Sequence, residues 1–163
     1  MPERALTAGR DIGVADEACY PYTPGDQACN VCGDWQNRIT KVTGFHGLTS
    51  APTRMKECIS TRGPLTACFI VYRDFYAYRS GVYRHGTGDR SGGHCVSIVG
   101  HDDGQGCWIC KNSCGAGWGD NGFFRIAYGE CSIDTWDVRA VDGVQVSPQG
   151  VGTLWVEGSP PNR

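Results

Sequence analysis

Two apolar runs decide the fold: Gly92-Gly93-His94-Cys95-Val96-Ser97-Ile98-Val99-Gly100 and Cys107-Trp108-Ile109-Cys110-Lys111-Asn112-Ser113. Between them, Asp102-Asp103-Gly104-Gln105-Gly106 has strong turn chemistry. The sequence therefore predicts a two-stranded hairpin that brings His94, at the mouth of one strand, close to Asn112, at the end of the next. An imidazole held by an amide carbonyl is the orienting half of a cysteine-nucleophile site. No suitable nucleophile lies upstream.

The rest of the chain predicts an α+β fold, mainly antiparallel β with short helices. A short helix should begin at Ser50-Ala51-Pro52, with the Ser50 hydroxyl as its cap, and end at Gly63-Pro64. Residues 74–78 predict one helical turn, and residues 1–18 are expected to be irregular. Apolar alternation or β-rich composition predicts the remaining strands, over residues 38–46, 65–72, 81–84 and 123–128.

Length and charge exclude several classes of function. With 163 residues, the chain has the length of one domain and can bury a core. Its net charge of -2 provides no basic field for nucleic acid or anionic lipid. No apolar run approaches membrane-spanning length. The start, Met1 to Arg4, lacks the apolar core of a signal peptide, so we expect any export signal to lie outside this sequence.

Ten cysteines and 24 glycines indicate a loop-rich, sheet-rich chain. The favoured interpretation is an exported protein braced by disulfides. The alternative is a four-thiolate zinc site, built from Cys29-x-x-Cys32 and Cys107-x-x-Cys110. However, residues 107 and 110 lie on a predicted strand, where positions three apart point to opposite faces. We therefore expect neither a metal nor a cofactor.

Several motifs occur in the same order as in the papain-like cysteine peptidases, which this chain resembles from about residue 11 to 140. The matching motifs are Cys19-Tyr20-Pro21-Tyr22-Thr23, Gly63-Pro64-Leu65, Asp74-Phe75-x-x-Tyr78-x-Ser80-Gly81-Val82-Tyr83, Gly93-His94-Cys95-Val96, Lys111-Asn112-Ser113-x-Gly115-x-Gly117-Trp118-Gly119-x-Asn121-Gly122 and Gly129-Glu130-Cys131-x-Ile133-Asp134.

The resemblance implies a two-lobed fold, of which this chain is the second, β-rich lobe. His94 would be the general base, and Asn112 would orient its ring. The carbonyl of Gly93 would face the substrate backbone, and Gly92 would leave room for it. The implied organisation is an irregular segment over residues 1–18, the lobe over 19–140, and an extra strand or linker-like tail over 141–163.

Two departures from the family pattern bear on activity. The motif Gln…Cys-Gly-Ser-Cys-Trp, which supplies the nucleophile and an oxyanion donor, is absent. Cys95 adjoins His94, but its side chain should point to the opposite face of the strand, so we expect a small core residue there. Cys114 stands where the family usually has a tryptophan that covers the histidine–asparagine pair. Trp118 remains and would compensate only in part.

The resemblance also affects the cysteines, whose connectivity stays open. The loop after the Tyr-Pro-Tyr motif often bonds to the first lobe in the family, so Cys29 or Cys32 would lack its partner. Cys131 usually pairs with a cysteine shortly before the histidine, yet residues 79–93 contain none. The alternative partners are Cys58, Cys68, Cys107, Cys110 and Cys114.

The sequence thus favours the His/Asn half of a cysteine peptidase, inactive in isolation, with a peptide or protein as substrate and a missing N-terminal lobe or partner chain. The alternative is a non-catalytic binding module or pseudo-peptidase. Asp102-Asp103 and Asp120-Asn121 are turn formers rather than calcium ligands. The other histidines, His46, His85 and His101, are expected on the surface or in loops. The tryptophans Trp35, Trp108 and Trp136 are expected in the core or at the lobe interface.

Overall fold

The computed structural model describes residues 2–23 and 25–147. Contacts divide the described residues into two compact units, one built around Phe45–Asp142 and the other around Arg4–Gly44 with residues 143–147. All the residues of the candidate site lie in the first unit.

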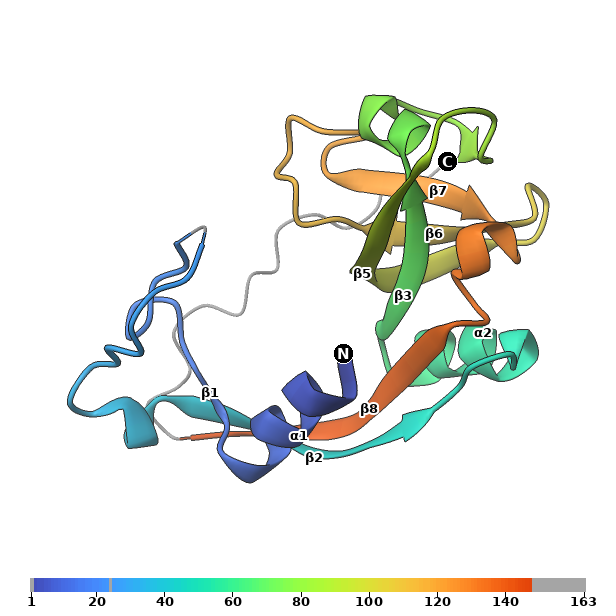
Figure 1. The fold of residues 1–163 in the computed structure, drawn as a ribbon. Helices are drawn as coiled ribbons and strands as arrows, with labels where there is room; N and C mark the ends of the chain where they lie inside the picture. Colours follow the sequence, from blue (N-terminus) through green and yellow to red (C-terminus); the bar gives the residue numbers. More distant parts are fainter. Residues whose placement is uncertain (1, 24, 148–163) are drawn as a thin grey trace. The chain divides into compact units, whose positions relative to one another are not determined.

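The first unit is built on a mainly antiparallel sheet. Its strands follow the order β8-β3-β5-β6-β7-β4, and Figure 1 shows β3, β5, β6 and β7 side by side. Strand β4 pairs in parallel with β7. The strands are β3 (Leu65–Tyr72), β4 (Val82–Tyr83), β5 (Arg90–Asp102), β6 (Cys107–Lys111), β7 (Phe123–Ala127) and β8 (Asp137–Val146).

The predicted hairpin is confirmed as β5 and β6. The two strands pair in antiparallel register from Ser97↔Lys111 to Asp102↔Cys107. Strand β5 is longer than β6, so its first half lies outside this pairing. Within the part of the chain that the structure describes, that half pairs with β3 alone. The strands predicted over residues 38–46, 65–72, 81–84 and 123–128 are confirmed too, within one or two residues at their ends.

Aromatic side chains form the centre of the core. Phe69 on β3, Trp108 on β6 and Phe124 on β7 are at most 1% exposed. The Phe69 ring lies 5.1 Å from that of Phe75 and 5.8 Å from that of Phe124, centroid to centroid. Phe75 comes from the short 3-10 helix η2 (Arg73–Ala77), which confirms the predicted helical turn. Such rings each bury about 150–250 Å², so this cluster is the main apolar support of the strands beneath the site.

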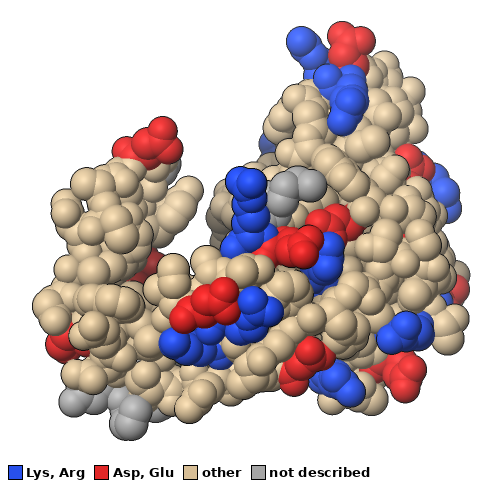
Figure 2. All heavy atoms as spheres, turned by 60° about the horizontal axis from the view of Figure 1, so that its bottom comes forward, with Lys and Arg blue, Asp and Glu red and all other residues tan. Residues whose placement is uncertain are grey.

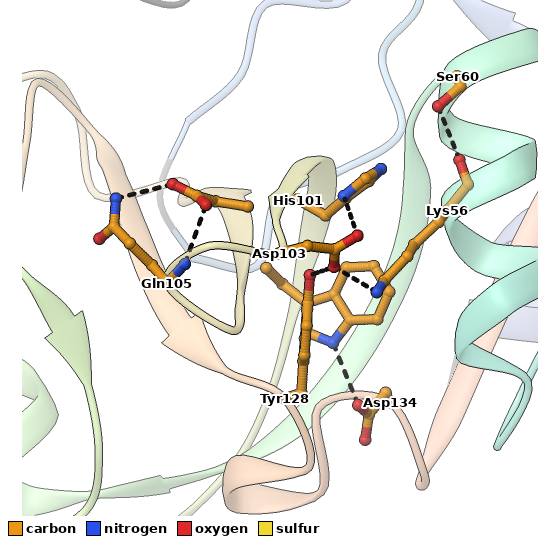
Figure 3. Close-up of polar contacts among 9 residues, drawn as sticks. Lys56, Ser60, His101, Asp103, Gln105, Tyr128 and Asp134 are labelled. Atoms are coloured by element: carbon orange, nitrogen blue, oxygen red, sulfur yellow. Dashed lines mark hydrogen bonds and ion pairs between the residues drawn. The ribbon is translucent and has the colours of Figure 1, made fainter. Parts of the chain in front are cut away.

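Helix α2 (Pro52–Thr61) packs on the sheet and is tied to the loop between β5 and β6. Figure 3 shows Lys56 and Tyr128 converging on Asp103 of that loop. The Tyr128 hydroxyl donates to Asp103 Oδ1 at 2.6 Å, and Lys56 forms an ion pair with the same carboxylate. Nearby, the buried Trp108 indole donates to Asp134 Oδ2 at 3.1 Å. These contacts hold the end of the hairpin opposite to Asn112.

Three details differ from the sequence prediction. Residues 2–11, expected to be irregular, form helix α1 (Pro2–Asp11), which has a proline at its start and Arg10 in its last turn, both favourable to a helix. Ser50 does not cap α2, because the N-cap is Ala51 and no side chain bonds there. Strand β8 begins at Asp137, before the extra strand or tail that was expected from residue 141, and residues 148–163 lie outside the described residues.

The second unit carries β1 (Val14–Ala15), which pairs with β2 (Ile39–Gly47), and the short 3-10 helix η1 (Trp35–Asn37). The Arg38 guanidinium donates to both oxygens of Asp16, at 2.9 and 2.8 Å. A disulfide joins Cys19 to Cys32. The chain passes between the two units within β2 and within β8.

Charged side chains of both signs are interspersed on the face drawn in Figure 2, without a broad field of either sign. The chain as a whole carries 15 basic and 17 acidic residues. Within the described residues, no helix has both the length and the apolar character that a membrane crossing requires.

Candidate active site

His94 and Asn112 meet as the hairpin predicted. His94 lies in β5, and Asn112 directly follows β6. His94 Nε2 and Asn112 Oδ1 are 2.9 Å apart. The same Oδ1 accepts the backbone N–H of Ser113 at 2.8 Å, which identifies it as an acceptor. Nε2 therefore carries the hydrogen and donates it, and the lone pair of Nδ1 stays available for a proton.

Asn112 is held in place by its surroundings. Only 7% of the residue is exposed, and its backbone N–H donates to the carbonyl of Gly122 at 2.9 Å. Phe69 lies directly opposite His94 in the β3–β5 register, and the two rings approach edge-on with centroids 6.0 Å apart. A neutral amide in a mostly buried setting fixes the ring without adding a charge. The pair is therefore a preorganised, oriented base.

The pair opens into a small pocket of about 180 Å³. This volume is below the range of about 300–1,000 Å³ for pockets that enclose drug-sized ligands, so it suits part of a larger molecule, such as one side chain of a peptide. The lining residues are Val71, Phe75, Tyr76, Ser91, Gly92, Gly93, His94, Asn112, Cys114 and Trp118.

Trp118 forms one wall of this pocket. Its indole nitrogen donates to the carbonyl of Tyr76 at 3.2 Å, and its ring packs against Phe75 with centroids 5.1 Å apart. Cys114 lines the same pocket as an exposed free thiol. The structure thus places both supporting residues expected from the sequence beside His94 and Asn112.

Gly92 and Gly93 lie on the part of β5 that precedes its pairing with β6. Among the described residues, β3 is the one strand paired with this part, because the register with β6 begins at Ser97. The second edge of this segment is therefore free to hydrogen-bond an extended peptide. Gly92 has φ +150°, a conformation that residues with a side chain rarely adopt.

Cys95 is not the small core residue that we expected. It is exposed, and it forms a disulfide with Cys68, which lies directly opposite on β3 with a Cα–Cα distance of 4.1 Å. The alternation of side chains along β5 turns Cys95 away from the buried face that Phe69 and His94 share. Since its sulfur is bonded, Cys95 is not available as a thiol beside His94.

The structure also shows which of the other cysteines are paired and which are free thiols. Cys32 pairs with Cys19, so its thiol is not available to the four-thiolate zinc site that we considered as an alternative, and Cys29 is free and exposed. Cys131 is also free, and burial, followed by the neighbouring Glu130 carboxylate, raises the pKa of its thiol to about 12. Burial likewise raises the pKa of the Cys107 and Cys110 thiols. These three thiols stay protonated near neutral pH and are poor nucleophiles.

Comparison with known proteins identifies the family. The model of the papain family cysteine proteases matches residues 1–141. The chain belongs to this family. It is 39% identical over 136 residues to "Cathepsin B-like CP2" of Giardia intestinalis, covering 75% of this chain and 45% of the relative. It is 48% identical over 148 residues to "Cathepsin B-like cysteine proteinase 4" of Caenorhabditis elegans, covering 82% and 43%. The chain thus spans less than half the length of these curated relatives.

Solved structures confirm the papain-like fold. The chain superposes on proCathepsin B S9 from Trypanosoma congolense with a TM-score of 0.73 and 30% identity, covering 86% of this chain and 52% of that one. The predicted α+β architecture, mainly antiparallel β, is therefore confirmed for this papain-family chain.

Some residues of the site were not singled out by the sequence. Phe69 supports the His94 ring, and Val71, Tyr76 and Ser91 complete the pocket. The strand pattern contained a signal for two of them. Alternation along residues 65–72 places Phe69 and Val71 on one face, so either would have been a candidate once the register with His94 was known.

Proposed function

We propose that this chain supplies the histidine and the asparagine of a cysteine peptidase site, and that the nucleophilic cysteine comes from sequence outside it. The observation that carries the proposal is the 2.9 Å contact between His94 Nε2 and Asn112 Oδ1, which leaves Nδ1 as a free base at a pocket. Family membership supplies the reaction class. The family's nucleophile motif is absent from the sequence.

The proposed reaction is hydrolysis of a peptide bond through a thioester. Nδ1 of His94 takes the thiol proton, and the thiolate attacks the carbonyl carbon of the peptide bond. The tetrahedral intermediate expels the amine, which receives the proton from His94. A water molecule, deprotonated by His94, then attacks the thioester. The carboxylic acid leaves, and the thiol regains its proton.

Asn112 would keep the imidazole in the orientation that this proton transfer needs. A neutral acceptor on Nε2 stabilises the charged ring without trapping the proton, as a well-placed orienting group does in nucleophile–base sites. The free edge of β5 at Gly92 and Gly93 would bind the substrate backbone. We assign these two glycines to substrate contact for that reason.

Cys114 should weaken the site. The strength of the His94–Asn112 hydrogen bond depends on how well water is kept from it, because local dielectric sets its electrostatic value. The Cys114 side chain is small and exposed, and Trp118 covers another wall of the pocket. A larger apolar side chain at position 114 would exclude water from the pair.

The test is reconstitution. The chain is mixed with the nucleophile-bearing lobe of a cathepsin B-like relative, and hydrolysis of a fluorogenic peptide is followed. We expect no turnover by the chain alone, turnover in the mixture, and loss of at least a hundredfold with His94→Ala, in line with general-base catalysis. His46→Ala, which alters a histidine paired with Asp142 outside the site, is the matched control.

Robust turnover by the chain alone that survives Cys95→Ser and dies with His94→Ala would show that the nucleophile lies within this chain. Turnover in the mixture that is unchanged by His94→Ala would remove His94 from the mechanism.

A second candidate is a binding module that has kept the lobe and lost the reaction. The exposed Cys114 beside the pair favours it, as does Tyr76, which lines the pocket and is 63% exposed. Cys114→Trp separates the two functions in the reconstituted mixture. Increased turnover supports the peptidase, whereas no turnover even with this variant supports the binding module.

A further inference from the structure

A second groove lies in the same unit, outside the His94 pocket. It is lined by Ile70 of β3, Arg90 at the start of β5, and Ser132, Thr135 and Trp136 from the segment that precedes β8. We call these five residues the Arg90 groove. A turn holds the Trp136 side, because the backbone N–H groups of Thr135 and Trp136 both donate to the carbonyl of Ser132, at 3.2 and 3.0 Å.

Gly93 connects this groove to the His94 pocket. It lines the pocket and lies opposite Ile70 in the β3–β5 register. A Cβ atom at Gly93 would lie 2.4 Å from Cη2 of Trp136, so the indole packs directly on the Gly93 backbone. Trp136 is nevertheless 40% exposed. A peptide bound along Gly92 and Gly93 would therefore pass from the pocket to the groove.

The charge of the groove is positive. Within residues 2–23 and 25–147, no carboxylate lies within ion-pairing distance of the Arg90 guanidinium, and the other four lining side chains are neutral. Several other arginines of the chain do have carboxylate partners: Arg10, Arg38, Arg62, Arg125 and Arg139.

Together, these groups form a complementary surface for a carboxylate on a short aliphatic stem. A guanidinium binds a carboxylate with two parallel hydrogen bonds, and hydroxyl groups add further donors. Trp136 and Ile70 provide apolar surface for the methylene groups of the stem. Glutamate and aspartate have this structure, and a neutral or basic side chain would leave the guanidinium without a partner.

We propose that the Arg90 groove binds an acidic side chain of the peptide substrate, and that Arg90 is a specificity-determining residue. The proposal rests on the function proposed above, because it takes the bound peptide to be the substrate of the His94 site. It assigns to this chain a preference for acidic sequences near the cleaved bond.

Binding to the full chain tests the preference without turnover. Two capped tripeptides, Ala-Glu-Ala and Ala-Gln-Ala, are titrated while the Trp136 indole N–H resonance is followed by NMR, with Trp136→Phe to assign that resonance. We expect the glutamate peptide to bind about three- to tenfold more tightly, the range of a partly exposed charge-assisted pair. The difference should shrink at high salt.

Variants identify the residue responsible. Arg90→Gln should reduce the ratio of the two dissociation constants to about one, whereas Arg79→Gln, at an exposed arginine outside the groove, should leave it unchanged. Equal binding of the two peptides, or a ratio that Arg90→Gln leaves unchanged, overturns the proposal. So does equally tight binding of a capped single glutamate, which would indicate a site for small carboxylates instead of a peptide.

The outcome is separable from that of the proposed function. His94→Ala should abolish turnover in the reconstituted mixture and leave the ratio of the dissociation constants unchanged. Acid preference without reconstituted turnover contradicts the peptidase proposal alone, and turnover without acid preference contradicts the Arg90 assignment alone.

Discussion

Replacing Asp74 by asparagine tests how the segment that leads into β5 is held. Asp74 lies in η2, its side chain is 20% exposed, and both of its oxygens accept hydrogen bonds. Oδ1 accepts the Tyr83 hydroxyl at 2.7 Å and His85 Nδ1 at 3.3 Å. Oδ2 accepts the backbone N–H groups of Gly86 and Thr87 at 2.9 and 3.1 Å. The residues that follow lead directly into Arg90, Gly93 and His94.

The magnitude follows from this arrangement. Asparagine has one oxygen, so either pair of donors would face an amide NH₂ group. Hydrogen bonds to a charged group contribute about 1.5–3 kcal/mol each, and an unsatisfied buried donor costs about 1–3 kcal/mol. With one pair of donors lost and some exposure to water, we expect Asp74→Asn to lower the free energy of unfolding by about 2–4 kcal/mol.

The pH dependence has a defined sign. Partial burial by itself would raise the pKa of Asp74, but the hydrogen bonds from Tyr83, Gly86, Thr87 and His85 outweigh it, so the pKa lies well below its usual range. A depressed folded-state pKa contributes stability above the unfolded pKa of about 4, and this contribution is lost as the pH falls through the folded value. The difference between wild type and variant should therefore narrow below about pH 4.

Urea unfolding of both chains, followed by tryptophan fluorescence over a pH series, measures this difference. Asp89→Asn is the matched control, since Asp89 is exposed and its contact with Arg73 is made by the backbone carbonyl, which accepts the Arg73 N–H and is kept in the variant. A loss below about 0.5 kcal/mol for Asp74→Asn, within the range of ordinary surface substitutions, would refute the reasoning. A difference that widens in acid would refute the assigned charge state.

Three further predictions concern the core and the cysteines. Phe69→Ala should lower the free energy of unfolding by about 3–5 kcal/mol, because the side chain is fully buried. Tyr76→Ala, at an exposed side chain, should lower it far less. Similar losses for the two variants in thermal or urea unfolding would contradict the assignment of Phe69 to the core. The double variant Cys68→Ala, Cys95→Ala should lower the free energy of unfolding by about 3–4 kcal/mol under oxidising conditions, because the bridge closes a loop between residues 27 positions apart. An unchanged denaturation midpoint would count against the disulfide. Burial raises the pKa of the Cys110 thiol, so alkylation at about pH 8 should be much slower in the folded chain than in urea, as peptide mass spectrometry can show. Equal rates would place Cys110 outside the core.

The sequence predicted those features that depend on local pattern. The hairpin over β5 and β6 followed from two apolar runs and a loop with strong turn chemistry, and the meeting of His94 with Asn112 followed from the hairpin. Helix α2 and strand β3 were predicted closely because a proline start and an unbroken apolar run are strong local signals.

Features that depend on long-range register could not be predicted. Cys68 and Cys95 are 27 residues apart, and only the antiparallel pairing of β3 with β5 brings them together. The packing of Trp136 on Gly93 likewise depends on long-range pairing, because β3 pairs with both β5, which carries Gly93, and β8, which directly follows Trp136. Helix α1 was missed for another reason: its polar composition gives little apolar periodicity, although Pro2 and Arg10 are favourable end signals. Cys114 and Trp118 line the same pocket as Asn112 and follow it closely in the chain, so local sequence was enough to name them as candidates.

The Cys68–Cys95 bridge sets two chemical requirements against each other. Thiol enzymes are commonly kept active by reductants, since an oxidised nucleophile cannot attack. Here the exposed sulfur next to the proposed base would meet the same reductant, and its loss would loosen the strand that carries the imidazole. Activation of the nucleophile and loss of the bridge would then both depend on the concentration of reductant. Turnover would pass through a maximum at an intermediate reductant concentration instead of rising steadily.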